Sequence, residues 1–182
     1  MIAEELKAER SHVFSKPMNA PHGMLLGRFN VNVDGDADDY ARRLRAVMHA
    51  ALDIAADPEF DNMEELPTRD IPGWFVGVTG GAGSPMDLAT RGVRQYTKDR
   101  DEPAWNLQEW LFTFDPQNRS WFWWDITYLG GGVVNIWVDT HSEPIVGNEQ
   151  LYWLAYACGA SSVGHMTLES AEVCESEPSI GI

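Results

Sequence analysis

Three β-type runs in the second half of the chain constrain its fold more than any other feature. They span residues 107–114, 121–129 and 133–141, and the links between them are Asp115-Pro-Gln-Asn-Arg-Ser120 and Gly130-Gly-Gly132. Links this short and this rich in turn-forming residues join neighbouring antiparallel strands, because a parallel pair needs a longer crossover. The sequence therefore predicts an antiparallel meander.

The rest of the chain adds helices and further strands. Strand-type patterns occupy residues 24–33, 74–79 and 163–168. One-sided apolar stripes predict helices over about residues 36–57, 84–98 and 148–158. Asp36 or Asp38 is the expected cap of the first helix, because carboxylates stabilise the positive end of a helix. Together these elements predict a single α+β domain, in which two to three helices pack mainly on one face of an antiparallel sheet of about five or six strands.

The two ends of the chain lack such patterns. Residues 1–23 are mixed in character and end in the turn-prone Asn19-Ala-Pro-His-Gly23, so we expect an irregular N-terminal segment. Residues 170–182 are acidic and are expected to form a loosely ordered tail. The start of the chain is charged throughout, unlike a secretory signal, and no stretch is apolar enough for a membrane helix. Because Cys158 and Cys174 stand in settings too different for a disulfide framework, we expect a cytoplasmic protein.

The net charge excludes two classes of ligand. The 182 residues include 13 Lys and Arg against 28 Asp and Glu, which gives a net charge of −15. Nucleic acids and anionic lipids are bound mainly through Lys and Arg, so neither is an expected partner. Solubility alone needs a net charge of only about 2–8 in magnitude for a small domain. We therefore expect a basic protein as the partner, and the sequence leaves the oligomeric state open.

The meander predicts one strand face that combines aromatic and acidic side chains. If the three-glycine link places Leu129 opposite Val133, the aliphatic side chains of both strands share the core face. The other face then carries Trp123, Asp125, Thr127, Asn135, Trp137 and Asp139. This face is either a second packed layer, with the tryptophans under a helix, or a recognition surface for a cationic partner. On the second interpretation its anchors are Trp123, Asp125, Trp137 and Asp139. Its steering rim is then Asp34, Asp36, Asp38 and Asp39.

No recognisable catalytic motif is present. The stretch Asp139-Thr-His141-Ser-Glu143 places three potential ligands of a divalent transition metal at alternating positions. Pro144 ends that strand and no second histidine lies nearby in sequence, so we prefer to interpret it as a polar strand end. The glycine-rich Gly80-Gly-Ala-Gly83 lacks the Gly-Lys-Ser/Thr ending of a nucleotide-binding loop. We therefore predict no cofactor and no bound metal, and we favour a binding protein over an enzyme.

The tryptophan-rich strands and the helix after them carry a resemblance to a known class. The strands contain Trp121-Phe-Trp-Trp-Asp125 and Asn135-Ile-Trp-Val-Asp139, and Gly147-Asn-Glu-Gln-Leu-Tyr-Trp-Leu-Ala-Tyr-Ala-Cys-Gly159 follows. In this layout, residues 105–169 resemble the small cytoplasmic immunity proteins of bacterial toxin–immunity systems. The resemblance implies a non-enzymatic inhibitor that binds a cognate basic toxin, often by covering its active site with acidic and aromatic side chains.

Two alternative functions stay open. The first is a small metal-dependent enzyme that uses Asp139 and His141, with Asp125 as a further candidate. The second is a binder of carbohydrate or another small ligand, which stacks on the tryptophan rings. Bound metal would support the first, and quenching of tryptophan fluorescence by sugars would support the second.

Overall fold

The computed structural model describes residues 2–18 and 21–182. Its helices are α1 (Ile2–His12), α2 (Ala37–Ala55), α3 (Gly73–Val78), α4 (Asp87–Arg100), α5 (Leu107–Phe112), α6 (Glu149–Ala157) and α7 (Ala171–Ser176), with a short 3-10 helix, η1 (Phe60–Asn62). Its strands are β1 (Leu25–Val33), β2 (Phe122–Gly130), β3 (Val133–Asp139), β4 (Ala160–Val163) and β5 (Thr167–Ser170). The predicted α+β class is confirmed. The expectation of two to three helices is wrong, because these described residues form seven α-helices.

The strands form one antiparallel sheet, but their order is not that of a meander. The order is β2-β3-β1-β4, and β5 also pairs with β1. β2 and β3 form the predicted hairpin across the glycine-rich turn. β1, which comes from the N-terminal half of the chain, pairs with β3 from Gly27–Val138 to Asn32–Val133. The sheet therefore places the start of β1 beside the end of β3.

Two segments that we predicted as strands are helices. The first run of the expected meander is α5, which is capped by the side chain of Asn106. Its buried residues are Leu107, Trp110 and Leu111, spaced as one face of a helix. The run expected as a strand over residues 74–79 is α3. Apolar runs of this length fit either structure, so packing against the rest of the molecule decides between them.

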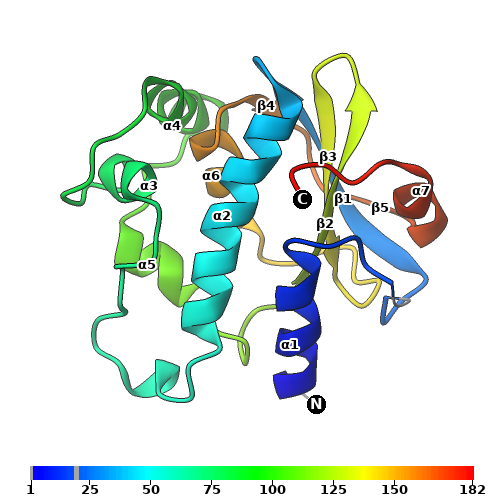
Figure 1. The fold of residues 1–182 in the computed structure, drawn as a ribbon, viewed down its shortest axis with the longest axis horizontal. Helices are drawn as coiled ribbons and strands as arrows, with labels where there is room; N and C mark the ends of the chain where they lie inside the picture. Colours follow the sequence, from blue (N-terminus) through cyan, green and yellow to red (C-terminus); the bar gives the residue numbers. More distant parts are fainter. Residues whose placement is uncertain (1, 19–20) are drawn as a thin grey trace.

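The long helix α2 forms where the sequence predicted a helix. Asp36 is its N-cap, and the carboxylate accepts a hydrogen bond from the Asp39 amide at 2.8 Å. Its buried stripe includes Tyr40, Leu44, Val47, Met48, Ala51, Leu52 and Ala55. Figure 1 shows α2, α3, α4, α5 and α6 on one side of the sheet and α7 on the other side. The main core therefore lies between the sheet and the larger group of helices.

A bulge in β2 divides the hairpin into two parts. From Asp125 to Tyr128 the pairing follows the predicted register, with Asp125 opposite Trp137, but next to the turn Gly130 and not Leu129 lies opposite Val133, because the register shifts again after Tyr128. The register shifts by one residue at Trp124, so that Trp123 lies opposite Val138. Because neighbouring residues of a strand point to opposite faces, Trp123 joins the main core and Trp124 packs on the other face with Trp137.

Both terminal segments fold against the sheet. The expected irregular segment, residues 1–23, contains α1, and the turn expected at its end falls partly outside the described residues. The expected loose tail, residues 170–182, contains α7 and then runs antiparallel along the outer edge of β2. In that stretch the Ile180 amide donates to the Ile126 carbonyl at 3.1 Å. These segments are ordered because they bury the tryptophan-rich half of the sheet.

None of the helices in residues 2–18 and 21–182 combines the length and the apolar character that crossing a bilayer requires.

Candidate functional site

The side chains predicted to anchor a partner lie inside the molecule. Trp123, Asp125 and Trp137 have no solvent exposure, and Asp139 is 1% exposed. The prediction that this strand face is an exposed recognition surface is therefore wrong. The other interpretation, a second packed layer, is the one that the fold adopts.

The chain's own C-terminal segment covers the part of that face around Trp137. The ring N–H of Trp137 donates to the Thr127 hydroxyl at 2.7 Å, and the ring packs with Cys174 of α7. The side-chain amide of Asn135 donates to the Glu177 carboxylate at 3.0 Å. These contacts occupy the position that we predicted for a partner protein.

Most of the tryptophans are not accessible to a sugar. Of the eight, six are buried, and only Trp74 and Trp105 are partly exposed. A platform for a carbohydrate needs the face of a ring open to solvent. The alternative of a carbohydrate binder would therefore depend on Trp74 or Trp105 and not on the rings of β2 and β3.

Asp125 belongs to a buried structural junction. Its carboxylate pairs with Arg45 of α2 at 2.6 Å, and neither side chain has any solvent exposure. Arg45 also donates to the carbonyls of Val13 at 2.6 Å and Ile180 at 2.8 Å. Burial lowers the pKa of Arg45, and the Asp125 carboxylate opposes this shift. The junction joins α2, β2 and both terminal segments, so Asp125 is not free to bind a metal.

The four aspartates of the predicted steering rim lie around the N-terminus of α2. Three of them form hydrogen bonds or ion pairs within the chain. Asp36 caps the helix, and both Asp38 and Asp39 form ion pairs with Arg42. Asp38 also accepts a hydrogen bond from the Gly181 amide at 2.8 Å. Asp34 is exposed. Three of the four carboxylates therefore stabilise the helix and the C-terminal segment.

Asp139 organises two loops that meet at one end of the sheet. One carboxylate oxygen accepts from the His141 amide at 2.9 Å. The other accepts from the His22 amide at 2.8 Å and from Nδ1 of the His22 ring at 2.9 Å. Because an ionised carboxylate only accepts hydrogen bonds, the Nδ1–H of His22 donates to Asp139, which leaves Nε2 as the ring nitrogen on the side of Glu5.

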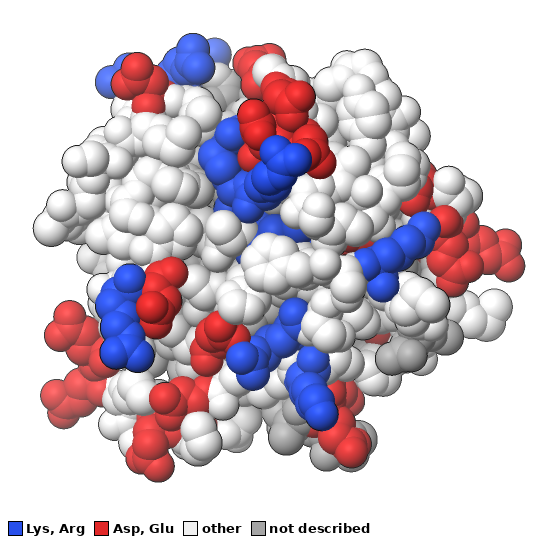
Figure 2. Space-filling view, viewed as in Figure 1, with Lys and Arg blue, Asp and Glu red and all other residues white. Residues whose placement is uncertain are grey.

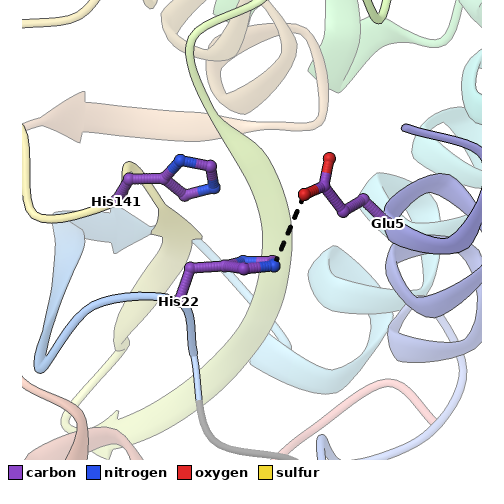
Figure 3. A group of neighbouring side chains, drawn as sticks. All are labelled: Glu5, His22 and His141. Atoms are coloured by element: carbon purple, nitrogen blue, oxygen red, sulfur yellow. Dashed lines mark ion pairs between the residues drawn. The ribbon is translucent and has the colours of Figure 1, made fainter. Parts of the chain in front are cut away.

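The two histidines form a cluster with Glu5 of α1. Figure 3 shows the three side chains converging from α1, from the loop before β1 and from the loop after β3. One potential ligand atom from each residue lies within 4.8 Å of those of the other two. Nε2 of His22 is 3.6 Å from the Glu5 carboxylate, and the two imidazole rings are 4.6 Å apart. Two imidazoles and a carboxylate are a set that binds divalent transition metals.

A cavity of about 270 Å³ adjoins this cluster. Its lining includes Glu5, His22, Asp139 and the aromatic residues at the start of β2. His12 also lines it, and Nδ1 of His12 is buried without a hydrogen-bond partner. Burial lowers the pKa of His12, while the nearby carboxylates of Asp125 and Asp139 oppose that shift. The cavity therefore presents a neutral imidazole beside a potential metal site.

A second feature is an acidic patch on the helical side of the molecule, beside the exposed ring of Phe112. Figure 2 shows acidic side chains projecting at the lower left, where Figure 1 places η1 and its flanking loops. Asp61 and Asp115 line a cavity beside Phe112, while Glu64 and Glu65 are exposed on the loop after η1 and Glu109 is exposed on α5. These five carboxylates are called the acidic patch. Gln108 of α5 holds the loop in place, because its side chain bonds both the amide and the carbonyl of Leu66.

The carboxylates of the acidic patch are not neutralised by ion pairs within the described part of the chain. Among the described residues, no Lys, Arg or His forms an ion pair with any of its five carboxylates. Gln117 draws two of them together, since its side chain donates to Asp61 at 2.5 Å and its amide to Asp115 at 2.8 Å. A cavity of about 340 Å³ lies between these carboxylates and the rings of Phe60 and Phe112. It is an aromatic pocket with a negative rim.

Comparisons of the chain with protein-family models, with curated protein sequences and with solved structures found no match.

Sequence reasoning found part of the histidine cluster and missed the rest. The pattern Asp139-Thr-His141-Ser-Glu143 identified Asp139 and His141, whereas Glu143 is exposed and lies outside the cluster. His22 and Glu5 come from a segment without a clear pattern. The signal that would have found His22 is the antiparallel pairing of β1 with β3, which brings the residues before β1 beside those after β3.

Proposed function

We propose that the protein binds a basic protein through the acidic patch, as an inhibitor of the immunity-protein type. The observation that carries the proposal is the set of five carboxylates around Phe112 that have no positive partner within the described chain. Neighbouring like charges repel one another and are relieved when a partner supplies the opposite charge. The buried tryptophans of β2 and β3 have no part in this contact.

The pocket between the rings and the carboxylates fits a cationic side chain. A Lys or Arg of the partner that enters it lies beside the exposed Phe112 ring and meets the charges of Asp61 and Asp115, while the buried Phe60 completes the lining. A cation over an aromatic face gains about 0.5–2 kcal/mol, more where water is excluded. Phe112 is 38% exposed before binding, so its ring also supplies apolar area to an interface. An aromatic centre with a charged rim is a common layout of binding hot spots.

The overall charge supports a rapid encounter with such a partner. A net charge of −15 extends an attractive field well beyond the patch itself. Electrostatic steering raises association rates to about 10⁸–10⁹ M⁻¹s⁻¹ at low salt. Speed of this kind suits an inhibitor that must reach a toxin before the toxin acts. Affinity would rest on the few desolvated contacts in the pocket, while the charge sets the rate.

The test is co-expression with the product of the neighbouring gene, followed by binding measurements over a range of salt concentrations. We expect a stable complex whose association rate falls steeply as salt rises. Phe112→Ala should weaken binding by about tenfold or more, as expected for an interface anchor. Asp61→Asn combined with Asp115→Asn should weaken it further and flatten the dependence on salt.

The matched control is Glu172→Gln combined with Glu175→Gln, which removes the same charge from α7. This control should retain nearly full affinity, because α7 lies on the other side of the sheet from the acidic patch. Absence of a complex, or binding that is indifferent to salt, would contradict the proposal. Equal losses in the patch variant and the control variant would contradict the location of the site.

A further inference from the structure

We infer that Glu5, His22 and His141 form a binding site for one divalent transition-metal ion, and that Asp139 orients the two histidines. The metal site lies at the end of the sheet beside α1 and shares none of the residues of the acidic patch. A result that contradicts the proposed binding function therefore leaves the metal site untouched, and the reverse also holds.

The spacing of the three side chains fits an ion after small adjustments. Zinc–nitrogen and zinc–oxygen bonds are about 2.0–2.2 Å long, which places tetrahedral ligands about 3.3–3.5 Å apart. Nε2 of His22 and the nearer oxygen of Glu5 are already 3.6 Å apart. The separations in the whole cluster are within 4.8 Å, a gap that side-chain rotation alone can close. His141 is exposed and Glu5 half-buried, so neither ring nor carboxylate is locked against such a rotation.

Asp139 supplies the support that metal-binding histidines usually have. A histidine that binds a metal through one ring nitrogen commonly donates the other N–H to a carboxylate, which fixes the tautomer and the ring orientation. Nδ1 of His22 makes this bond to Asp139 at 2.9 Å and leaves Nε2 on the side of Glu5. The same carboxylate holds the backbone of His141 through its amide at 2.9 Å. One side chain thus sets the position of two of the three ligands.

The charge around Asp139 independently favours a cation. Its carboxylate is buried, and among the described residues its only ion-pair partner is His22. The other buried carboxylates nearby, Glu9 and Asp125, are each paired with an arginine. A buried carboxylate without a full positive partner is costly, and a divalent ion on the far nitrogen of His22 would supply that charge. Among the described residues no Lys or Arg pairs with Asp139, so a cation held by the proposed ligands would lie beside a carboxylate that has no arginine partner.

The ligand set narrows the choice of metal and its coordination. Imidazole with carboxylate suits zinc, iron, cobalt, nickel or manganese, whereas calcium and magnesium prefer oxygen ligands only. Three protein ligands leave at least one position for water or a small molecule, which is typical of catalytic sites and untypical of structural ones. When bound, zinc in such a site lowers the pKa of its water to about 7.

The adjoining cavity gives a small molecule access to the coordination position that the three protein ligands leave open. Glu5 and His22 line the cavity, so a molecule inside it lies next to the proposed ion. His12 lines the same cavity, and its Nδ1 is buried without a hydrogen-bond partner. Phe122, which also lines the cavity, stacks on the His141 ring at 5.6 Å. The cavity therefore has room for a small ligand beside the proposed ion.

The experiment is a calorimetric titration of metal-free, tag-free protein with Zn²⁺, repeated with Co²⁺ so that its visible absorption reports the coordination. We expect one saturable site per chain. His22→Ala and His141→Ala should each lower the affinity by about 100-fold or more, because each removes a ligand. Asp139→Asn should lower it by about 10–100-fold, the usual effect of removing a partner of a ligand histidine.

Controls separate a lost site from a lost fold. His49→Ala removes a histidine that pairs with Asp53 on α2, outside the cluster, and should leave zinc binding unchanged. Circular dichroism checks that each variant is folded, and His22→Ala remains informative if Asp139→Asn unfolds, because the His22 side chain is half-exposed. The inference is overturned if no saturable zinc binding occurs. It is equally overturned if folded His22→Ala and His141→Ala bind zinc as the unmodified protein does.

Discussion

Two buried aspartates, one on each strand of the β2–β3 hairpin, are compensated in different ways. Asp125 is paired with Arg45, a full positive charge that is itself completely buried, at 2.6 Å. Asp139 is held by the His22 ring and by two backbone amides. The two carboxylates thus share a similar depth and sit on neighbouring strands, yet only Asp125 has an arginine.

The difference distinguishes a structural junction from a candidate site. The remaining N–H groups of Arg45 donate to backbone carbonyls of both terminal segments. The Arg45–Asp125 pair is therefore closed to any further ligand. The donors to Asp139 come from loops and include an imidazole whose other nitrogen faces a cavity. Asp125 therefore supports the fold through a closed ion pair. Asp139 supports a place that can still accept a ligand.

The largest expected effect is on the arginine side of the comparison. Arg45→Met leaves Asp125 as an unpaired buried charge, and breaking a buried pair in this way costs about 3–5 kcal/mol of unfolding free energy. Urea denaturation followed by tryptophan fluorescence measures this. Arg42→Ala, which removes exposed ion pairs on the same helix, should cost no more than about 1 kcal/mol. Equal losses in the two variants would mean that Asp125 does not depend on Arg45.

The next effect concerns the missing charge at Asp139. Zn²⁺ at 100 times its dissociation constant should raise the unfolding free energy of the unmodified protein by about 2.7 kcal/mol, because the ion binds only the folded state. The rise should be absent in His141→Ala, which retains Asp139 and all of its hydrogen-bond donors, because His141 donates through its backbone amide. Denaturation with and without Zn²⁺ measures the effect. A rise of the same size in both proteins would place the ion elsewhere.

Removal of the imidazole from Asp139 in metal-free protein should have a smaller effect. His22→Ala deletes one donor, but the two backbone amides remain and water can reach the half-exposed position of the ring. We expect a loss of about 1 kcal/mol, as for a single hydrogen bond. Urea denaturation of His22→Ala beside Arg45→Met gives the comparison directly. A loss as large as that of Arg45→Met would show that His22 already acts as a full charge partner.

The smallest effect is a pH dependence that both aspartates influence. Burial lowers the pKa of His12, and Asp125 and Asp139 oppose the shift. Below about pH 6.5 the unfolded chain binds a proton at this residue that the folded chain refuses, so the unfolding free energy falls as the pH drops. We expect His12→Gln to lose less stability than the unmodified protein between pH 7.5 and pH 5.5.

One histidine can change the unfolding free energy by at most about 1.4 kcal/mol per pH unit. His165→Gln, which replaces an exposed histidine, is the matched control and should behave as the unmodified protein does. Parallel pH profiles for His12→Gln and the unmodified protein would indicate that His12 titrates normally in the folded state.

The hairpin of β2 and β3 could be predicted from the sequence, and the bulge within it could not. Aliphatic residues at alternate positions of β2 and β3 fix the register, because a slip would mix polar and apolar side chains. The bulge lies within Trp121-Phe-Trp-Trp, where every side chain is large and apolar. No change of polarity marks the shift there, so nothing in the local pattern shows which tryptophan changes face.

The terminal segments were missed because distant contacts order them. Glu9 of α1 forms a two-pronged pair with Arg119, at 2.6 and 2.8 Å, across more than a hundred residues of sequence. The C-terminal segment depends in the same way on the edge of β2. Without these partners, neither segment has enough periodic apolar residues to predict its structure. The exposure of the anchors was mispredicted for the same reason, because the covering segments had been treated as unstructured.

The candidate metal site shows a similar limit. Asp139 and His141 are two residues apart and visible as a motif, but His22 lies well over a hundred residues before them. Their meeting depends on the pairing of β1 with β3 and not on local spacing. Glu5 further requires α1 to pack at the same end of the sheet. The sequence therefore identifies the supporting carboxylate and one ligand, His141, but not the two ligands that come from the other end of the chain.

The carboxylate of Asp139 also has a consequence for motion. It accepts the backbone amide hydrogens of His22 and His141, one on each oxygen. A rotation of that single side chain releases both hydrogens in one event, so the two loops share an opening step although they are remote in sequence. Exchange of these two amides with deuterated solvent should accelerate together, and by a similar factor, whenever Asp139 is loosened.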